Sequence, residues 1–110
     1  MKVINLTPNT IKVINNKKEL LAQFEPSGTL AIARVNPPRE VGKIGNIPIG
    51  TAVTFDGVEN LPEPQEGVMY IVSPLEGRAV KDRTDVLIPE ITIMTPREGD
   101  VISVRQLLTC

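Results

Sequence analysis

The sequence contains no histidine and no tryptophan, and its 110 residues include a single cysteine. Histidine is the usual general base near neutral pH and the commonest transition-metal ligand, so its absence excludes Ser-His-Asp and Cys-His catalysis and imidazole metal sites. The one cysteine is Cys110, so neither an intrachain disulfide nor a cysteine metal cluster can form. We therefore predict no catalytic residues, no metal site and no cofactor.

The chain also lacks an excess of charge and a long apolar run. Twelve basic residues against thirteen acidic ones leave a net charge of -1, so there is no positive field to attract nucleic-acid phosphates. No apolar segment approaches the ~18 residues that span a bilayer, and no charged leader precedes one. We expect a soluble, cytoplasmic protein that is neither a general nucleic-acid binder nor a membrane protein.

Aromatic residues are scarce at 3%, whereas apolar residues make up 41% of the chain. The core must therefore be built from aliphatic side chains, many of them β-branched, which favour strands. Ten prolines and eight glycines divide the chain into segments suited to short strands. This pattern predicts one compact, mainly β domain over residues 1–110, built of antiparallel hairpins in a sheet or small barrel, with one short helix. The expected strands are residues 3–6, 11–14, 20–24, 29–35, 52–55, 58–61, 68–72, 85–88, 91–94 and 101–104.

Three central segments allow more detailed predictions. Residues 29–35 are apolar on both faces, which is typical of a central or covered strand. Residues 36–50 are rich in proline and glycine and are expected to form a mobile loop with a short strand. Asp56-Gly57 lies between two apolar segments, which predicts a hairpin with a type I′ turn.

The segment Ser73-Pro74-Leu75-Glu76 matches a capping box. In this motif the serine oxygen accepts a helix N–H, proline takes the first helical position, and the glutamate reaches back to the serine N–H. A short helix is therefore predicted to begin at Pro74 and to end near Lys81 or Asp82.

Three pieces of the sequence resemble a family of small uncharacterised proteins from bacteriophages, prophages and bacteria. They are V-I-N-L-T-P-N-T-I at the start, L-P-E-P-Q-E-G-V-M-Y-I-V-S in the middle, and R-A-V followed by R-x-D-V and Pro89. Relatives usually carry histidine at the position of Asn9, which is a turn residue on the simplest interpretation. The resemblance implies a viral or mobile-element origin and a compact accessory protein, and it provides no active site to transfer.

The candidate ligand-binding residues form two groups. Arg78, Lys81 and Arg83 alternate with Asp82 and Asp85, which indicates either a solvated ion-pair face or a site where guanidinium groups bind phosphate or carboxylate. In the second case Tyr70 would help to orient the ligand. Arg34 and Arg39, near the Pro-Gly segment, could close over an anion or be scattered loop charges.

The function predicted from these residues is non-catalytic binding by a phage or prophage accessory protein in the bacterial cytoplasm. Its partner would be a small anionic, nucleotide-like signal molecule, whose sequestration would counteract host defence. An alternative is a protein interaction module that binds a host or viral protein, and a homo-oligomer is also left open. A small hydrolase that uses carboxylates is the least favoured alternative.

Overall fold

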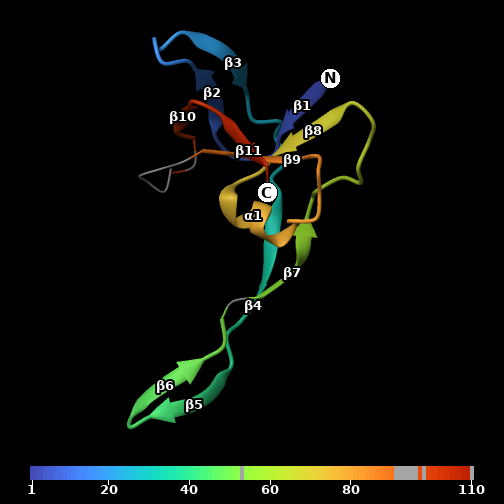
Figure 1. Cartoon of the computed structure of the whole chain (residues 1–110). Coiled ribbons are helices and arrows are strands. Elements are labelled where there is room, and N and C mark those ends of the chain that lie inside the picture. The colour runs from blue at the N-terminus through green and yellow to red at the C-terminus, as the bar shows by residue number, and fades with distance from the viewer. Residues whose placement is uncertain (53, 91–96, 98, 110) are drawn as a thin grey trace.

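Strands and one short helix make up the fold, which confirms the predicted mainly β class (Figure 1). The computed structural model describes residues 1–52, 54–90, 97 and 99–109, with 50% of the chain in strands and 6% in helix. The strands form four small sheets, and in this described part they do not close into a barrel. In chain order the elements are β1 (Lys2–Asn5), β2 (Thr10–Ile14), β3 (Leu20–Phe24), β4 (Ile32–Asn36), β5 (Glu40–Ile44), β6 (Ile47–Gly50), β7 (Thr54–Glu59), β8 (Val68–Ile71), α1 (Pro74–Ala79), β9 (Val86–Pro89), β10 (Val101–Val104) and β11 (Leu107–Thr109).

Two of the sheets and the helix form the body of the molecule. The four-stranded sheet has the order β1-β8-β9-β11, with β8 parallel to both β1 and β9, and with β11 antiparallel to β9. The three-stranded sheet has the order β10-β2-β3, and its β2–β3 hairpin is the one predicted from the sequence. The predicted core strand is β8, and its Tyr70 and Ile71 are fully buried.

The core consists of two clusters of mostly aliphatic side chains, as the composition requires. The first contains Leu6, Ala31, Tyr70, Val72 and Val86, and the second contains Ile11, Ile71 and Val104. Since β8 contributes Tyr70 to one cluster and Ile71 to the other, this strand is buried on both faces.

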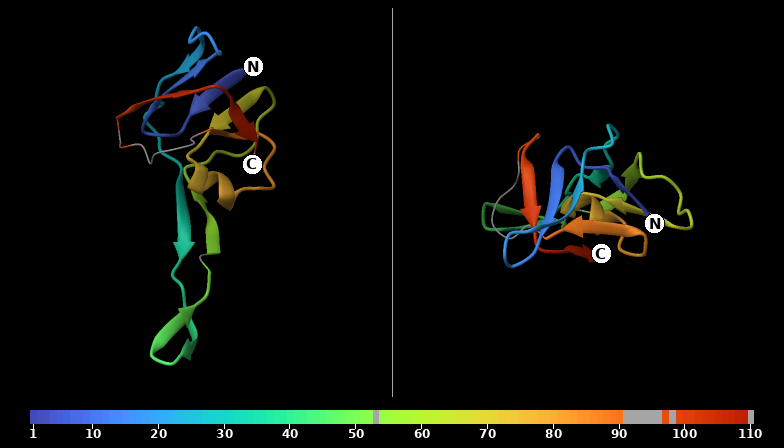
Figure 2. Two further views of the ribbon diagram at one scale, coloured as in Figure 1. Left: turned by 60° about the vertical axis from the view of Figure 1, so that its left-hand side comes forward. Right: turned by 90° about the horizontal axis from the view of Figure 1, so that it is seen from above.

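The other two sheets form an arm that projects from the body (Figures 1 and 2). Strand β4 pairs with β7, and β5 pairs with β6 further out, both antiparallel. We call residues 32–59 the arm. It accounts for the elongated shape of the molecule, which extends 55 × 32 × 22 Å.

The arm corrects all three predictions for the centre of the chain. Strand β4 is neither central nor covered, because Ile32 and Val35 are 49% and 44% exposed in a two-stranded sheet. Residues 40–50 form the β5–β6 hairpin, so two paired strands replace the predicted loop with one short strand. Its turn is Gly45-Asn46, where Gly45 has a φ of 59°, as a two-residue hairpin turn with glycine first requires.

Asp56-Gly57 is not a hairpin turn, because both residues lie inside strand β7. Ala33 pairs with Val58 and Val35 pairs with Phe55, so β7 contains one residue more than β4 over this stretch. The extra residue makes a β-bulge, and Gly57 has a φ of 84° there. Glycine is therefore required for the same reason as in a turn, namely a left-handed backbone conformation, but the chain continues in the same direction.

Helix α1 begins at Pro74 as predicted and ends at Ala79, slightly earlier than expected. The predicted capping bond is wrong, because the Ser73 side chain makes no cap hydrogen bond. Glu76 is also bonded elsewhere: its Oε2 accepts a hydrogen bond from the backbone N of Ala33 at 3.4 Å, linking the helix to the base of the arm. No helix in the described residues is long and apolar enough to cross a membrane.

The C-terminal part of the chain contains one predicted strand and one strand that was not predicted. The predicted strand at residues 91–94 lies outside the described residues, whereas the one at 101–104 forms as β10 and pairs with β2 in parallel. Strand β11 follows it and was not predicted.

Candidate functional site

Arg83 is held by an ion pair within its own segment. Its Nε and Nη2 donate to the two carboxylate oxygens of Asp85, each at 2.7 Å, and Nη2 also donates to the carbonyl of Pro62 at 2.9 Å. Both side chains are largely buried, with 19% of Arg83 and 13% of Asp85 exposed. The guanidinium hydrogen bonds lower the pKa of the Asp85 carboxyl below its ordinary value. Arg83 therefore links Pro62 to Asp85, and its guanidinium already makes hydrogen bonds to both residues.

Tyr70 lies in the first core cluster and is fully buried. Its hydroxyl has no hydrogen-bond partner in the described structure. A ligand could reach this side chain only if the core opened, so the structure gives Tyr70 a packing role.

Arg34 and Arg39 both lie on the arm. The Nε of Arg34 is 3.2 Å from Oε1 of Glu59, and about half of each side chain is exposed. Arg39 borders a hollow of about 450 Å³, which is lined by Asn36, Pro37, Arg39, Thr51 and Thr54. The structure thus separates Arg39 from the other predicted site residues, none of which lines this hollow.

Arg78 and Lys81 are the two predicted residues that the structure brings to one hollow. The hollow has a volume of about 200 Å³ and is lined by Pro74, Gly77, Arg78, Lys81, Ile88 and Thr109, which come from α1, the turn after it, β9 and β11. Both cationic side chains are exposed. Neither forms an ion pair with a described residue, so the ion-pair face considered in the sequence analysis does not form at these two side chains.

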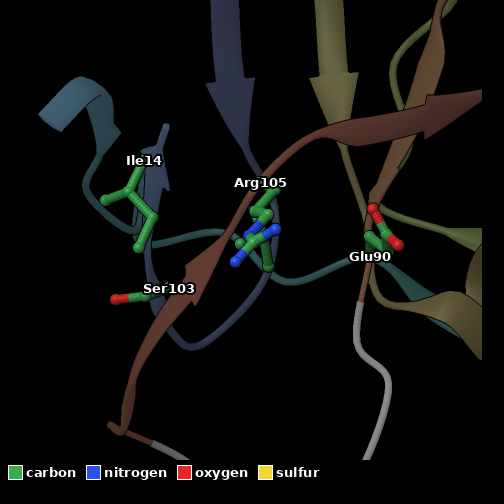
Figure 3. A pocket seen from close by; sticks show the side chains of 5 residues that line it. Ile14, Glu90, Ser103 and Arg105 are labelled. Carbon is green, nitrogen blue, oxygen red and sulfur yellow. The ribbon is translucent and has the colours of Figure 1, made fainter. Parts of the chain in front are cut away.

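A further hollow involves residues that the sequence analysis did not identify. It has a volume of about 420 Å³ and is lined by Ile14, Glu90, Ser103, Val104 and Arg105 (Figure 3). Figure 3 shows the Arg105 side chain between those of Ile14 and Glu90. These residues are distant in sequence, and the unexpected parallel pairing of β10 with β2 brings Ser103 and Ile14 to the same sheet. No local motif could have identified this hollow.

Asn9 is a buried structural residue and not merely a turn residue. It is 4% exposed, and its Nδ2 donates to the carbonyls of Arg97 at 2.7 Å and Asp100 at 3.0 Å. The side-chain amide of Asn9 therefore links the N-terminal segment by hydrogen bonds to Arg97 and Asp100, which precede β10.

The described residues contain no group of three or more acidic, histidine or cysteine side chains that could hold a metal ion. A scan against protein-family models, a search of curated proteins and a search of solved structures each found no match.

Proposed function

We propose that the protein is a non-catalytic binding protein that holds a small anionic molecule in the hollow bordered by Arg78 and Lys81. One observation carries this proposal: two exposed cations border the same hollow, and neither forms an ion pair with a described residue. Arg83, in contrast, already forms an ion pair with the carboxylate of Asp85. An anion would give Arg78 and Lys81 the charged partner that the described residues do not supply.

The rest of the lining indicates what else the ligand contains. Pro74, Gly77 and Ile88 provide an apolar surface beside the two cations, and Thr109 contributes a polar residue. A ligand with both an apolar face and a phosphate or carboxylate suits such a surface, and a nucleotide has both. The resemblance to bacteriophage and prophage proteins supports a role in the bacterial cytoplasm, where sequestration of a nucleotide-like signal would counteract host defence.

Calorimetric titration with a panel of cyclic and linear nucleotides tests this function. Arg78→Ala should weaken binding by about tenfold or more, because a charge-assisted hydrogen bond contributes roughly 1.5 kcal/mol or more. Lys81→Ala should weaken it less, since an ammonium group lacks the planar fork of guanidinium. Arg105→Ala is the matched control, since Arg105 is also exposed but lines a different hollow, and it should leave binding unchanged. Equal losses in all three variants, or no heat from any nucleotide with the wild type, would refute the proposal.

A second candidate, a protein interaction module, is favoured by a different observation. Every residue from 34 to 50 is exposed, and several of these are large aliphatic side chains. A cluster of exposed aliphatic side chains is typical of a protein interface. The two functions are separable, because the hollow beside α1 and the outer part of the arm share no residue.

A further inference from the structure

The outer hairpin of the arm has one face made of isoleucines. Ile44 pairs with Ile47, and Gly42 pairs with Ile49. Directly paired residues, and residues two apart on a strand, point to the same side of a sheet. Ile44, Ile47 and Ile49 therefore share one face, which we call the isoleucine face, and they are 69%, 61% and 38% exposed.

No described part of the chain covers this face. Both strands of the hairpin are exposed along their whole length, and neither core cluster includes a residue from them. An isolated two-stranded hairpin is only marginally stable in water, and it needs a further strand or another packed surface for a stable structure. The described part of the chain supplies neither a further strand nor a packed surface for this hairpin.

The chain exposes more surface than a compact protein of its size. The chain exposes 7692 Å², whereas a compact monomer of 12.0 kDa would expose roughly 6,000 Å². Its radius of gyration is 16.6 Å, against about 13 Å for a compact domain of this length. The excess of about 1,700 Å² is larger than the roughly 800 Å² that each partner buries in a standard stable interface. The elongated chain thus has enough additional surface for an interface of standard size.

The charge of the arm indicates which kind of partner fits. The arm contains three basic residues and three acidic ones, namely Arg34, Arg39, Lys43, Glu40, Asp56 and Glu59, so its net charge is zero. Two of these pairs are satisfied internally, Arg34 with Glu59 and Lys43 with Glu40. A neutral arm does not attract a strongly charged partner, and it imposes no net repulsion between two copies of itself.

We propose that a second copy of this chain covers the isoleucine face. Interfaces between identical subunits are more apolar than transient ones, and most oligomers of soluble proteins are homo-oligomers. The three isoleucines supply such an apolar surface at the end of an arm long enough to reach beyond its own body (Figure 2). This inference rests on the interaction-module candidate and not on the anion site.

The test compares the mass of the native protein with that of an arm variant, by light scattering after size exclusion and by native mass spectrometry. We expect the wild type to be a dimer or a larger homo-oligomer, and the double variant Ile44→Ser/Ile47→Ser to be monomeric with an unchanged circular-dichroism spectrum. The matched control is Leu20→Ser/Leu21→Ser, since these β3 residues are 56% and 63% exposed on the body. The control should assemble like the wild type.

Hydrogen exchange of the wild type provides a second measurement that needs no substitution. The amides of residues 40–50 should be protected in the assembled protein and lose that protection on dilution to monomers. A wild type that is monomeric at its highest soluble concentration would overturn the inference, as would an arm variant that assembles normally. A monomeric wild type whose arm still binds a purified protein of different sequence would retain the interaction module but refute the second copy as the occupant.

Discussion

Asn5 shows how a single polar side chain can organise an aliphatic fold. It is 2% exposed, and its amide forms four hydrogen bonds. Nδ2 donates to the carbonyls of Asn9 at 2.7 Å and Phe24 at 3.0 Å, while Oδ1 accepts from the backbone N of Thr7 at 3.0 Å and from its hydroxyl at 2.7 Å. The side chain thus connects the end of β1, the turn after it and the end of β3. These bonds explain why Asn5 and Thr7 are polar although both are buried.

Replacing Asn5 with aspartate preserves the shape of the side chain but removes both donors. Asn5→Asp should lower the free energy of unfolding at pH 7 by about 3 kcal/mol or more, because it leaves two carbonyls without their donor and buries an unpaired charge. Denaturant unfolding provides the measurement. The loss should shrink in acid, where the new carboxyl is protonated and regains one donor, and a pH-independent loss would contradict this explanation.

A substitution at Tyr70 should stabilise the protein, in contrast to the one at Asn5. Its ring fills the first core cluster, but its buried hydroxyl has no hydrogen-bond partner in the described structure. An unsatisfied buried hydroxyl costs roughly 1–3 kcal/mol, so Tyr70→Phe should raise the free energy of unfolding by about 1 kcal/mol. Thermal and denaturant unfolding of the two proteins measure the difference. Destabilisation would show that the hydroxyl has a partner, such as a buried water.

At the scale of elements, local sequence patterns correctly predicted several elements that form between residues close together in the sequence. The β2–β3 hairpin, the core strand β8 and the helix start at Pro74 all follow from alternation, apolar runs and proline placement. Two of the errors concern distant contacts, whereas the missed β5–β6 hairpin is a local one. Glu76 hydrogen-bonds Ala33 and not its own helix terminus, and Asp56-Gly57 is a bulge because β7 continues along β4. The sequence around Glu76 and around Asp56-Gly57 does not indicate that β4 lies beside them.

The contribution of the Glu76 carboxyl to stability depends on pH. Burial raises the pKa of Glu76 above its ordinary value of 4.5, and the hydrogen bond from Ala33 lowers it to a smaller extent. Because the folded pKa is the higher one, the stabilising contribution of the neutral carboxyl is present below about pH 4.5 and is lost as the pH rises through the folded value. Glu76→Gln should therefore raise stability at pH 7, by roughly a few tenths of a kcal/mol because the group is partly solvated.

Asp85 provides the control for this measurement, because its pKa is shifted in the other direction. Hydrogen bonds from Arg83 lower the pKa of Asp85, so its contribution is present above the ordinary value of 3.8 and is lost as the pH falls through the folded value. Unfolding curves from acid to neutral pH separate the two effects. Glu76→Gln should change the slope above about pH 4.5, and Asp85→Asn should change the slope below about pH 3.8. If Glu76→Gln destabilises the protein at pH 7, the Ala33 contact outweighs burial.

At the scale of the whole molecule, the two core clusters stabilise the body and contain no described residue of the outer arm. Both core clusters lie in the body or at the base of the arm, and the candidate anion site beside α1 does too. The sequence predicted the body better because its strands bury their apolar side chains within the chain. The apolar residues of the arm look like core residues in the sequence, because no sequence pattern indicates that they are exposed.

This division predicts that the arm can be removed without unfolding the body. Asn36 faces Thr54 in the β4–β7 register, so replacing residues 37–53 with an Asn-Gly turn would close the inner pair as a tight hairpin. The shortened protein should unfold cooperatively near the wild-type temperature, because none of the described residues that it loses belongs to a core cluster. It should also be a monomer with a radius of gyration of roughly 12 Å by X-ray scattering, and it should bind nucleotides as the wild type does. A deletion that unfolds the body would show that the outer arm stabilises the core, and one that still assembles would place the contact between copies on the body.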